Sequence, residues 1–222
     1  MKIILAIGGA VIKTAWIEIK HLASLKAFDV LVHNGGSLFH DFQRATDLSL
    51  GDEHSYPLSQ LMEDYSVNES ASKIVWSWLR REIKAPEGSL TRICEDQKVS
   101  VLMFTIPGAD FWHLFDRGWE LLGSRMSEDF FMLCDQMREP FHFICMGSAV
   151  VMPEVFTKAL ANVRPKDFKA DVVDFLEMYR PRTRVAKYGE YRITTHQAFL
   201  SEWLDRFSID YLHSFQESTG DG

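Results

Sequence analysis

The fold of this chain is decided by the stretch VLVHNGGSLFHD, residues 30–41. Its opening run VLV is short, apolar and β-branched, which is typical of a buried strand. The NGG that follows at residues 34–36 consists of residue types that tolerate positive φ and let a ligand approach the backbone. A helix is expected to begin soon afterwards. The stretch therefore predicts a strand, a turn and a helix. The turn either binds a ligand or only connects the strand to the helix.

The same alternation of strand and helix extends along the whole chain. Apolar runs predict strands at residues 2–7, 27–33, 99–105, 141–146, 170–175 and 191–194. Helical spacing of apolar residues predicts helices at residues 11–26, 69–84, 90–96, 127–137, 153–163 and 196–207, with Asn68 as a cap. Alternating strands and helices form a parallel sheet with right-handed connections. We therefore expect an α/β fold with a doubly wound, mostly parallel, Rossmann-like sheet and helices on both faces.

The length of 222 residues suits one α/β domain better than two separate cores. We expect a single domain over residues 1–215. Residues 47–65 are acidic and rich in turn formers, so they are expected to form a surface excursion and a candidate lid. Residues 216–222 are expected to be a flexible tail.

Charge and composition exclude several classes of partner. The net charge of −7 argues against nucleic acid or an anionic membrane as the main partner. No stretch is long enough to span a membrane, and the apolar start of the chain is interrupted by two glycines, unlike a signal peptide. The three cysteines lack CxxC spacing, so they indicate reduced thiols, no metal site and a cytoplasmic protein.

Small or polar residues end four of the predicted strands, at residues 8–9, 34–36, 108–110 and 147–149. The carboxyl ends of parallel strands share one edge of a sheet, so these turns should line a common groove. Backbone amides in such a groove can bind a phosphate or pyrophosphate. Neither GxGxxG nor GxxxxGK[ST] is present, so the standard nucleotide motifs are absent.

Five segments, in order, carry a family resemblance. They are GGAVIKT at residues 8–14, NGGSLFHDFQ at 34–43, PGADFWH at 107–113, GSAVVMPEVFTKAL at 147–160 and YRITTHQAF at 191–199. Together they resemble the deoxyhypusine synthase family, and more closely its bacterial branch. The resemblance covers most of the chain.

The resemblance implies a Rossmann-like fold, NAD as cofactor, and tetramers whose active sites lie between paired subunits. The authentic enzymes oxidise the polyamine spermidine with NAD and transfer its aminobutyl group, through an imine on a lysine, to a protein lysine. By position in the family motifs, the residues that would contact NAD here are Thr14, Asn34, Gly35, Gly36, Asp110, Gly147, Ser148 and Ala149.

This chain departs from the family where the reaction takes place. The family's paired acidic residues after the glycine turn are replaced by Phe39, His40 and Asp41. The Trp-Gly-Lys that presents the catalytic lysine is missing, and the nearest candidate is Lys187. The expected function is therefore not authentic deoxyhypusine synthesis.

Four residues are candidates for catalysis. His40 beside Asp41 is a candidate general base with a neighbouring carboxylate, and a capping Asp beside a surface His is the alternative. His113 would lie one helical turn from Asp110, on the same face of a helix. Glu154 is a candidate ligand contact, and the alternative is that it only stabilises the positive end of the helix dipole.

The leading hypothesis is an NAD-dependent transferase or oxidoreductase that acts on a small amine or related metabolite. The family resemblance implies that it forms a homotetramer. The alternative is a non-catalytic nucleotide-binding or assembly protein on the same fold. A hydrolase that uses His40 and Asp41 is a third hypothesis, for which no nucleophile elbow is visible.

Overall fold

The computed structural model describes residues 1–46, 69–82, 88–106, 109–110 and 119–219. The predicted acidic excursion at residues 47–65, the expected cap at Asn68 and the candidate His113 lie outside the described residues. Within the described part of the chain, no helix combines the length and the hydropathy needed to cross a membrane.

The core of the molecule is a six-stranded sheet in the order β3-β2-β1-β4-β5-β6. All five neighbouring pairs of strands are parallel. The strands are β1 (Lys2–Ile7), β2 (Val30–Asn34), β3 (Ser100–Phe104), β4 (Phe141–Met146), β5 (Phe168–Asp174) and β6 (Tyr191–Ile193). This is the strand order of dinucleotide-binding Rossmann folds, so the predicted fold class is confirmed.

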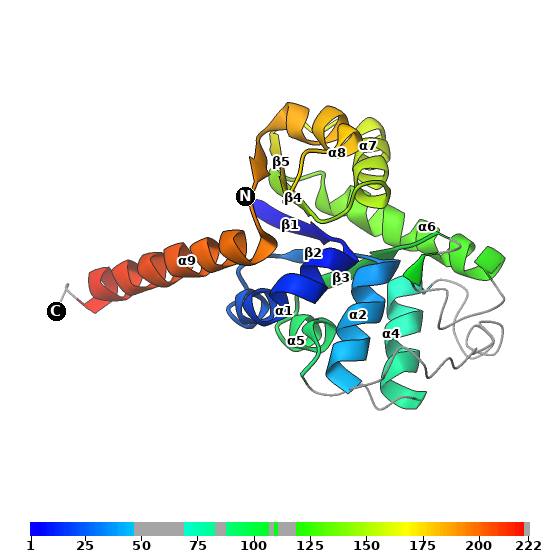
Figure 1. The fold of residues 1–222 in the computed structure, drawn as a ribbon, viewed down its shortest axis with the longest axis horizontal. Coiled ribbons are helices and arrows are strands. Elements are labelled where there is room, and N and C mark those ends of the chain that lie inside the picture. The colour runs from blue at the N-terminus through cyan, green and yellow to red at the C-terminus, as the bar shows by residue number, and fades with distance from the viewer. Residues whose placement is uncertain (47–68, 83–87, 107–108, 111–118, 220–222) are drawn as a thin grey trace.

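Helices lie on both faces of the sheet (Figure 1). Buried clusters and contacts place on one face α1 (Gly9–Ser24), α5 (Leu90–Asp96) and α9 (His196–Thr219). The other face carries α4 (Ala71–Glu82), α6 (Trp119–Gln136), α7 (Val151–Val163) and α8 (Tyr179–Arg184), followed by the 3-10 turn η2 (Ala186–Tyr188). The helix α2 (Gly35–Thr46) follows β2 directly and packs against α1.

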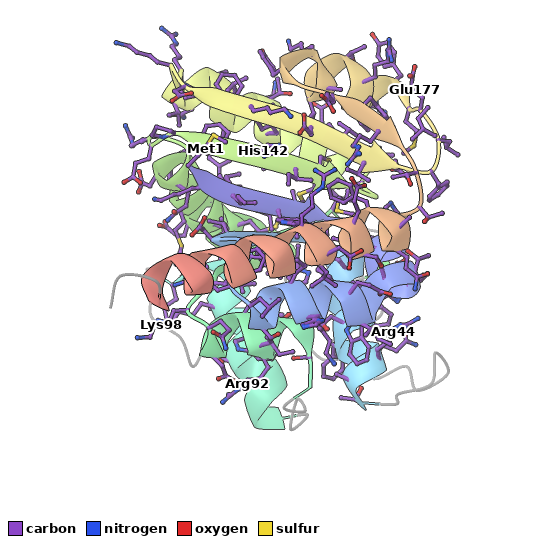
Figure 2. The ribbon with its side chains drawn as sticks, turned by 90° about the vertical axis from the view of Figure 1, so that its left-hand side faces the viewer. Met1, Arg44, Arg92, Lys98, His142 and Glu177 are labelled. Atoms are coloured by element: carbon purple, nitrogen blue, oxygen red, sulfur yellow. The ribbon has the colours of Figure 1, made fainter. Side chains whose placement is uncertain are left out.

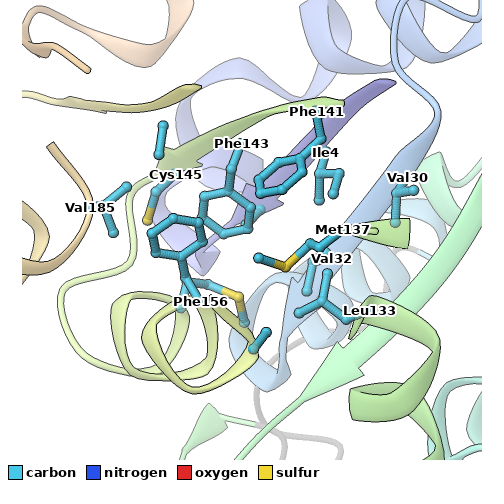
Figure 3. Close-up of a cluster of buried hydrophobic side chains, with 14 of the residues drawn as sticks. Ile4, Val30, Val32, Leu133, Met137, Phe141, Phe143, Cys145, Phe156 and Val185 are labelled. Atoms are coloured by element: carbon cyan, nitrogen blue, oxygen red, sulfur yellow. The ribbon is translucent and has the colours of Figure 1, made fainter. Parts of the chain in front are cut away.

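Strand alternation sends one set of apolar side chains toward α6 and α7 (Figure 3). Phe143 of β4 stacks on Phe156 of α7 with ring centroids 4.5 Å apart, and Phe141 stacks on Phe168 at the start of β5. Each fully buried phenylalanine contributes about 1.5–3 kcal/mol relative to an exposed one. These contacts fix α7, and therefore the turn that precedes it, against the sheet.

Several helix boundaries differ from the sequence prediction. The helix α6, for example, begins at Trp119 and not at residue 127. The helix α2 begins at Gly35, without an intervening loop, because Oδ1 of Asn34 accepts a hydrogen bond from the backbone N–H of Ser37 at 2.7 Å. The helix α9 was predicted to end at Phe207 but continues to Thr219, into the segment expected to be a flexible tail. No glycine or proline interrupts it, and its outer end projects from the body of the molecule (Figure 1).

Candidate functional site

The candidate site is the region beyond the carboxyl ends of β1 and β4, which is called the crevice below. These strands are neighbours in the sheet, yet the chain leaves β1 toward β2 and leaves β4 toward β5. The two connections therefore diverge on opposite sides, which is where open parallel sheets bind ligands. The turns after β1, β2 and β4 meet the crevice at Gly8, Asn34 and Gly147.

The turns after β1 and β4 touch each other through glycine backbone. A Cβ on Gly8 would lie 1.8 Å from the carbonyl oxygen of Gly147, so no side chain fits between them. Gly8 is the N-cap of α1 and supplies no capping side chain, and the first turn of α1 holds no acidic residue. The amino end of α1 is therefore left with its positive dipole uncompensated, as an anion-binding turn requires.

His40 and Asp110 form a hydrogen-bonded pair beside these turns. Nε2 of His40 lies 2.9 Å from Oδ2 of Asp110, and Nδ1 lies 3.2 Å from Oε1 of Gln43. The His40 side chain is 6% exposed, whereas that of Asp110 is 50% exposed. The amide of Gln43 can turn to present either its oxygen or its NH₂ group, so the contact accepts both protonation states of His40. A residue that transfers protons needs this property.

Two glycines let this pair lie close to the helix ends. A Cβ on Gly9 would lie 3.0 Å from Cδ2 of His40, and one on Gly36 would lie 3.2 Å from Oδ2 of Asp110. The imidazole and the carboxylate therefore rest against the first turns of α1 and α2. The predicted cofactor residues Gly36 and Asp110 are brought together with the predicted catalytic residue His40.

Asp41 is not the carboxylate that pairs with His40, and this corrects the pairing expected from the sequence. It is 1% exposed and accepts hydrogen bonds from Nε1 of Trp16 (2.8 Å) and from the backbone N–H groups of Leu90 and Thr91 (2.7 and 2.9 Å). The Thr91 hydroxyl donates a fourth, at 2.8 Å. Adjacent residues of a helix point in different directions, so Asp41 faces α5 while His40 faces the crevice.

A buried histidine completes the support of α2. Burial, which outweighs the nearby Asp41 charge, lowers the pKa of His33 to about 4, so its ring is neutral at physiological pH. Thr91 donates its only hydroxyl proton to Asp41, so its oxygen accepts from Nε2–H of His33 at 3.2 Å. Nδ1 then accepts from the hydroxyl of Ser37 at 2.8 Å. This chain of hydrogen bonds joins β2, α2 and α5 and holds His40 in place.

The other predicted cofactor residues are not hydrogen-bonded to the His40–Asp110 pair. Thr14 donates its hydroxyl to the carbonyl oxygen of Ala10 at 2.8 Å. Ser148 is buried, and its hydroxyl accepts from the N–H of Met152 at 3.3 Å, so it supports the start of α7. Ala149 is half-buried in the same turn. Gly35 is the buried first residue of α2.

Glu154, a predicted catalytic residue, is held by two arginines of α8. Its Oε2 lies 2.8 Å from Nη1 of Arg184, and its Oε1 lies 3.5 Å from Nε of Arg180. Glu154 lies in the first turn of α7, next to the turn at residues 147–149. The carboxylate is therefore part of an ion-paired cluster at the rim of the crevice.

Sequence reasoning missed a second buried histidine. His196, the first residue of α9, is 1% exposed and lies against Gly147, where a Cβ would be 3.1 Å from its Cε1. Its Nδ1 lies 3.2 Å from the Thr14 hydroxyl, while its Nε2 has no hydrogen-bond partner among the described residues and lies 3.6 Å from Oδ1 of Asp174. His196 follows β6, and Asp174 is the last residue of β5, so both lie at the carboxyl ends of predicted strands. That position in the sequence could have marked them as candidate site residues.

Lys187 lies at the other edge of the sheet. Its Nζ is 4.7 Å from the ring centroid of Tyr188, and that ring packs against Phe168, the first residue of β5. The amino ends of the strands lie there, opposite the crevice. Among the described residues, no group of three or more His, Cys, Asp or Glu side chains is arranged to hold a metal ion.

A cavity of about 470 Å³ lies away from the crevice, between α9 and the part of the sheet that α9 leaves uncovered (Figure 2). It is lined by His142 and Lys169, near the amino ends of β4 and β5, and both contact Asp171, at 2.7 and 2.9 Å. Burial raises the pKa of Asp171, but the hydrogen bonds outweigh it and lower the pKa to about 2. Open parallel sheets bind ligands beyond the carboxyl ends of their strands, so the crevice is the better candidate despite the cavity's volume.

Comparison with known proteins shows similarity of fold. No protein-family model matches the chain, and no curated protein sequence matches it significantly. AgrE, solved as a ternary complex with ornithine and NAD⁺, superposes with a TM-score of 0.59 at 15% identity over 95% of this chain. ArgZ, a cyanobacterial arginine dihydrolase of the ornithine-ammonia cycle, gives 0.56 at 17% over 90%.

This chain spans 31% of the AgrE chain and 28% of the ArgZ chain. A protein proposed to be a deoxyhypusine synthase, from Entamoeba histolytica, superposes with a TM-score of 0.51 at 12% identity, over 78% of this chain and 65% of that one. The expected Rossmann-like architecture is thus shared with an NAD-bound protein and with a protein proposed to be a deoxyhypusine synthase.

Proposed function

We propose that this protein is an NAD-dependent oxidoreductase or transferase that acts on a small amine. The observation that carries the proposal is the His40–Asp110 pair, which rests on the glycine turns at the edge of a dinucleotide-type sheet. The NAD⁺ and ornithine of the AgrE complex support the same assignment of cofactor and substrate class.

The residues of the crevice suit NAD. The amino end of α1 behind Gly8 would receive the pyrophosphate, because it carries no capping side chain and no acid. Asp110 uses Oδ2 for His40, and its Oδ1 has no other contact among the described residues, so it is available to a ribose hydroxyl. Asn34, Gly36 and the turn at residues 147–149 would form the walls. When bound, NAD⁺ supplies a hydride acceptor.

His40 would serve as the proton acceptor of an amine dehydrogenation. In that reaction the C–H bond next to nitrogen would break, and bound NAD⁺ would supply the hydride acceptor. The neutral amine nitrogen would give up a proton to Nδ1 of His40, the ring nitrogen that does not face Asp110, and the carbon–nitrogen bond would become an imine, so atoms and charge balance. Asp110 stabilises the imidazolium that results and orients the ring. Hydrolysis of the imine completes an oxidoreductase cycle, whereas transfer to a second amine completes a transferase cycle.

We further propose that the protein does not synthesise deoxyhypusine. That reaction needs a lysine held next to the cofactor, shielded from water and partly neutral. Lys187 is exposed and belongs to the opposite edge of the sheet. The His40–Asp110 pair moves a proton without any covalent step.

Replacing His40 with alanine is expected to lower amine-dependent reduction of NAD by about 10²- to 10⁴-fold, the usual contribution of a general base. Calorimetric affinity for NAD should change little. His142→Ala is the matched control, because His142 also pairs with an aspartate, at 2.7 Å, but at the amino end of the sheet. Equal losses in the two variants would contradict the role of His40, and an absence of NAD binding by the unaltered protein at millimolar concentration would contradict the proposed function.

We also propose that the protein is a homotetramer, as the family resemblance implies, and that it lies in the cytoplasm, as its reduced thiols indicate. Two exposed apolar side chains on α6, Phe131 and Met132, are 56% and 42% exposed, and the outer end of α9 projects from the body (Figure 1). Exposed apolar surface of this kind commonly marks an interface. Light scattering should give a mass close to four times 25.6 kDa, and the mass of a single chain at all concentrations would contradict the proposal.

A further inference from the structure

We propose that the amine substrate also carries a carboxylate, and that Arg180 of α8 binds it while Arg184 holds Glu154. This inference rests on the proposed function and names the substrate class more closely: an amino acid rather than a simple diamine or polyamine. It starts from the ion-paired cluster at the rim of the crevice.

The cluster holds more positive than negative charge. Arg180 and Arg184 lie one helical turn apart and share the single carboxylate of Glu154. The third arginine of α8, Arg182, pairs instead with Glu177 at 2.5 Å, so it adds nothing to this balance. Among the described residues, one guanidinium charge therefore remains without a carboxylate of its own at the amino end of α7.

The guanidinium of Arg180 has hydrogen-bond donors that are not used by Glu154. It approaches Glu154 only through Nε and at 3.5 Å, beyond a strong hydrogen bond, and no other ion pair or hydrogen bond of its side chain is found among the described residues. Its two terminal nitrogens are thus free to receive a planar carboxylate with two parallel hydrogen bonds. Arg184 is fixed by its 2.8 Å contact and holds Glu154 in place.

The surroundings suit the rest of an amino acid. Phe175 and Leu176, between β5 and α8, and Tyr179, the first residue of α8, have exposed fractions of 55%, 48% and 78%. These side chains precede Arg180 in the sequence and can cover an aliphatic stem. The rim thus offers apolar surface next to a guanidinium, at the carboxyl edge that also holds the crevice.

A polycation would find little to bind here. Among the described acidic side chains of the crevice, Asp41 is buried under four donors and Asp174 is 1% exposed. Asp110 pairs with His40 through one of its oxygens, and Glu154 pairs with two arginines. Positive charge is in excess only at the cluster of Arg180, Arg184 and Glu154, which favours a substrate whose anionic group binds there.

The test compares two probes that differ only by a carboxylate, L-ornithine and putrescine. Calorimetry on the unaltered protein saturated with NADH, which cannot accept a hydride, should show ornithine binding about 10- to 100-fold more tightly, the range for one charge-assisted contact. In Arg180→Met and Arg184→Met the ratio of the two affinities should fall below about threefold, and Arg180→Lys should recover part of it. Arg182→Met is the matched control and should keep the full ratio.

The ratio is measured within each variant, so a loss of folded protein affects both probes alike. Equal affinity for the two probes in the unaltered protein, or binding of neither, would overturn the inference. So would a ratio that survives both methionine substitutions. NAD is titrated first and alone: its failure to bind refutes the proposed function, whereas NAD binding without discrimination between the probes refutes only the carboxylate site.

Discussion

Replacing Gly8 with alanine is expected to lower the free energy of unfolding by about 3 kcal/mol or more, or to prevent folding altogether. The added Cβ would lie 1.8 Å from the carbonyl oxygen and 2.6 Å from the carbonyl carbon of Gly147. Both atoms belong to backbone, so no side chain can move aside. The turns after β1 and β4 would have to separate, and the N–H of Gly8 would lose its 2.8 Å hydrogen bond to Met146.

Gly123→Ala is the matched control for this change. Gly123 lies in α6, and a Cβ there would meet nothing within 4 Å. Alanine is the better helix former by about 1 kcal/mol, so this variant should be as stable as the original or slightly more so. Urea denaturation of the three proteins measures the difference. Similar midpoints for the Gly8 and Gly123 variants would show that the two turns do not touch in solution.

Replacing Asp41 with alanine is expected to cost about 3–5 kcal/mol of stability, because it leaves several buried donors without an acceptor. Those donors are the Trp16 indole, the Leu90 and Thr91 amides and the Thr91 hydroxyl. Asp41→Asn keeps one oxygen but turns an NH₂ group toward other N–H groups, so it should also be destabilising. Denaturant unfolding followed by circular dichroism gives the free energies.

The contrasting variant is Asp110→Asn. Asp110 is half exposed and its carboxylate pairs with His40, so its replacement should change stability by less than about 1 kcal/mol while lowering activity. We therefore expect Asp41 to stabilise the fold and Asp110 to take part in the chemistry. If Asp41→Asn unfolded normally and lost only activity, the structural role assigned to Asp41 would be wrong.

Several elements could be predicted closely because their signals are local. The strands β1 and β4 and the helix α5 have the predicted bounds, Lys2–Ile7, Phe141–Met146 and Leu90–Asp96. Each is an apolar run or helical pattern that ends at a glycine turn or begins at a capping side chain. Ser89, for example, caps α5 by accepting from the N–H of Arg92 at 3.1 Å.

Other elements could not be predicted from a local pattern, because capping and tertiary contacts outweigh the local propensity of their residues. The glycines at residues 35–36 have the composition of a loop, but the Asn34 cap starts a helix there. No helix is predicted for residues 179–184, yet α8 forms there and packs against α7, with Pro181 and the following Val185 buried. Tertiary contacts outweigh weak local propensity in such short segments.

The sequence by itself determined the strand alternation, the glycine turns at one edge of the sheet and the presence of His40 among them, because these follow from period, composition and chain order. The tertiary structure alone decided which carboxylate serves His40. β3 pairs in register with β2, Asn34 opposite Phe104, and so carries Asp110, 70 residues away, to the imidazole. The neighbouring Asp41 is turned about 100° around the helix and buried under α5. Sequence adjacency could not show this, because partners across a sheet are set by strand order and the direction of a helical side chain is set by packing.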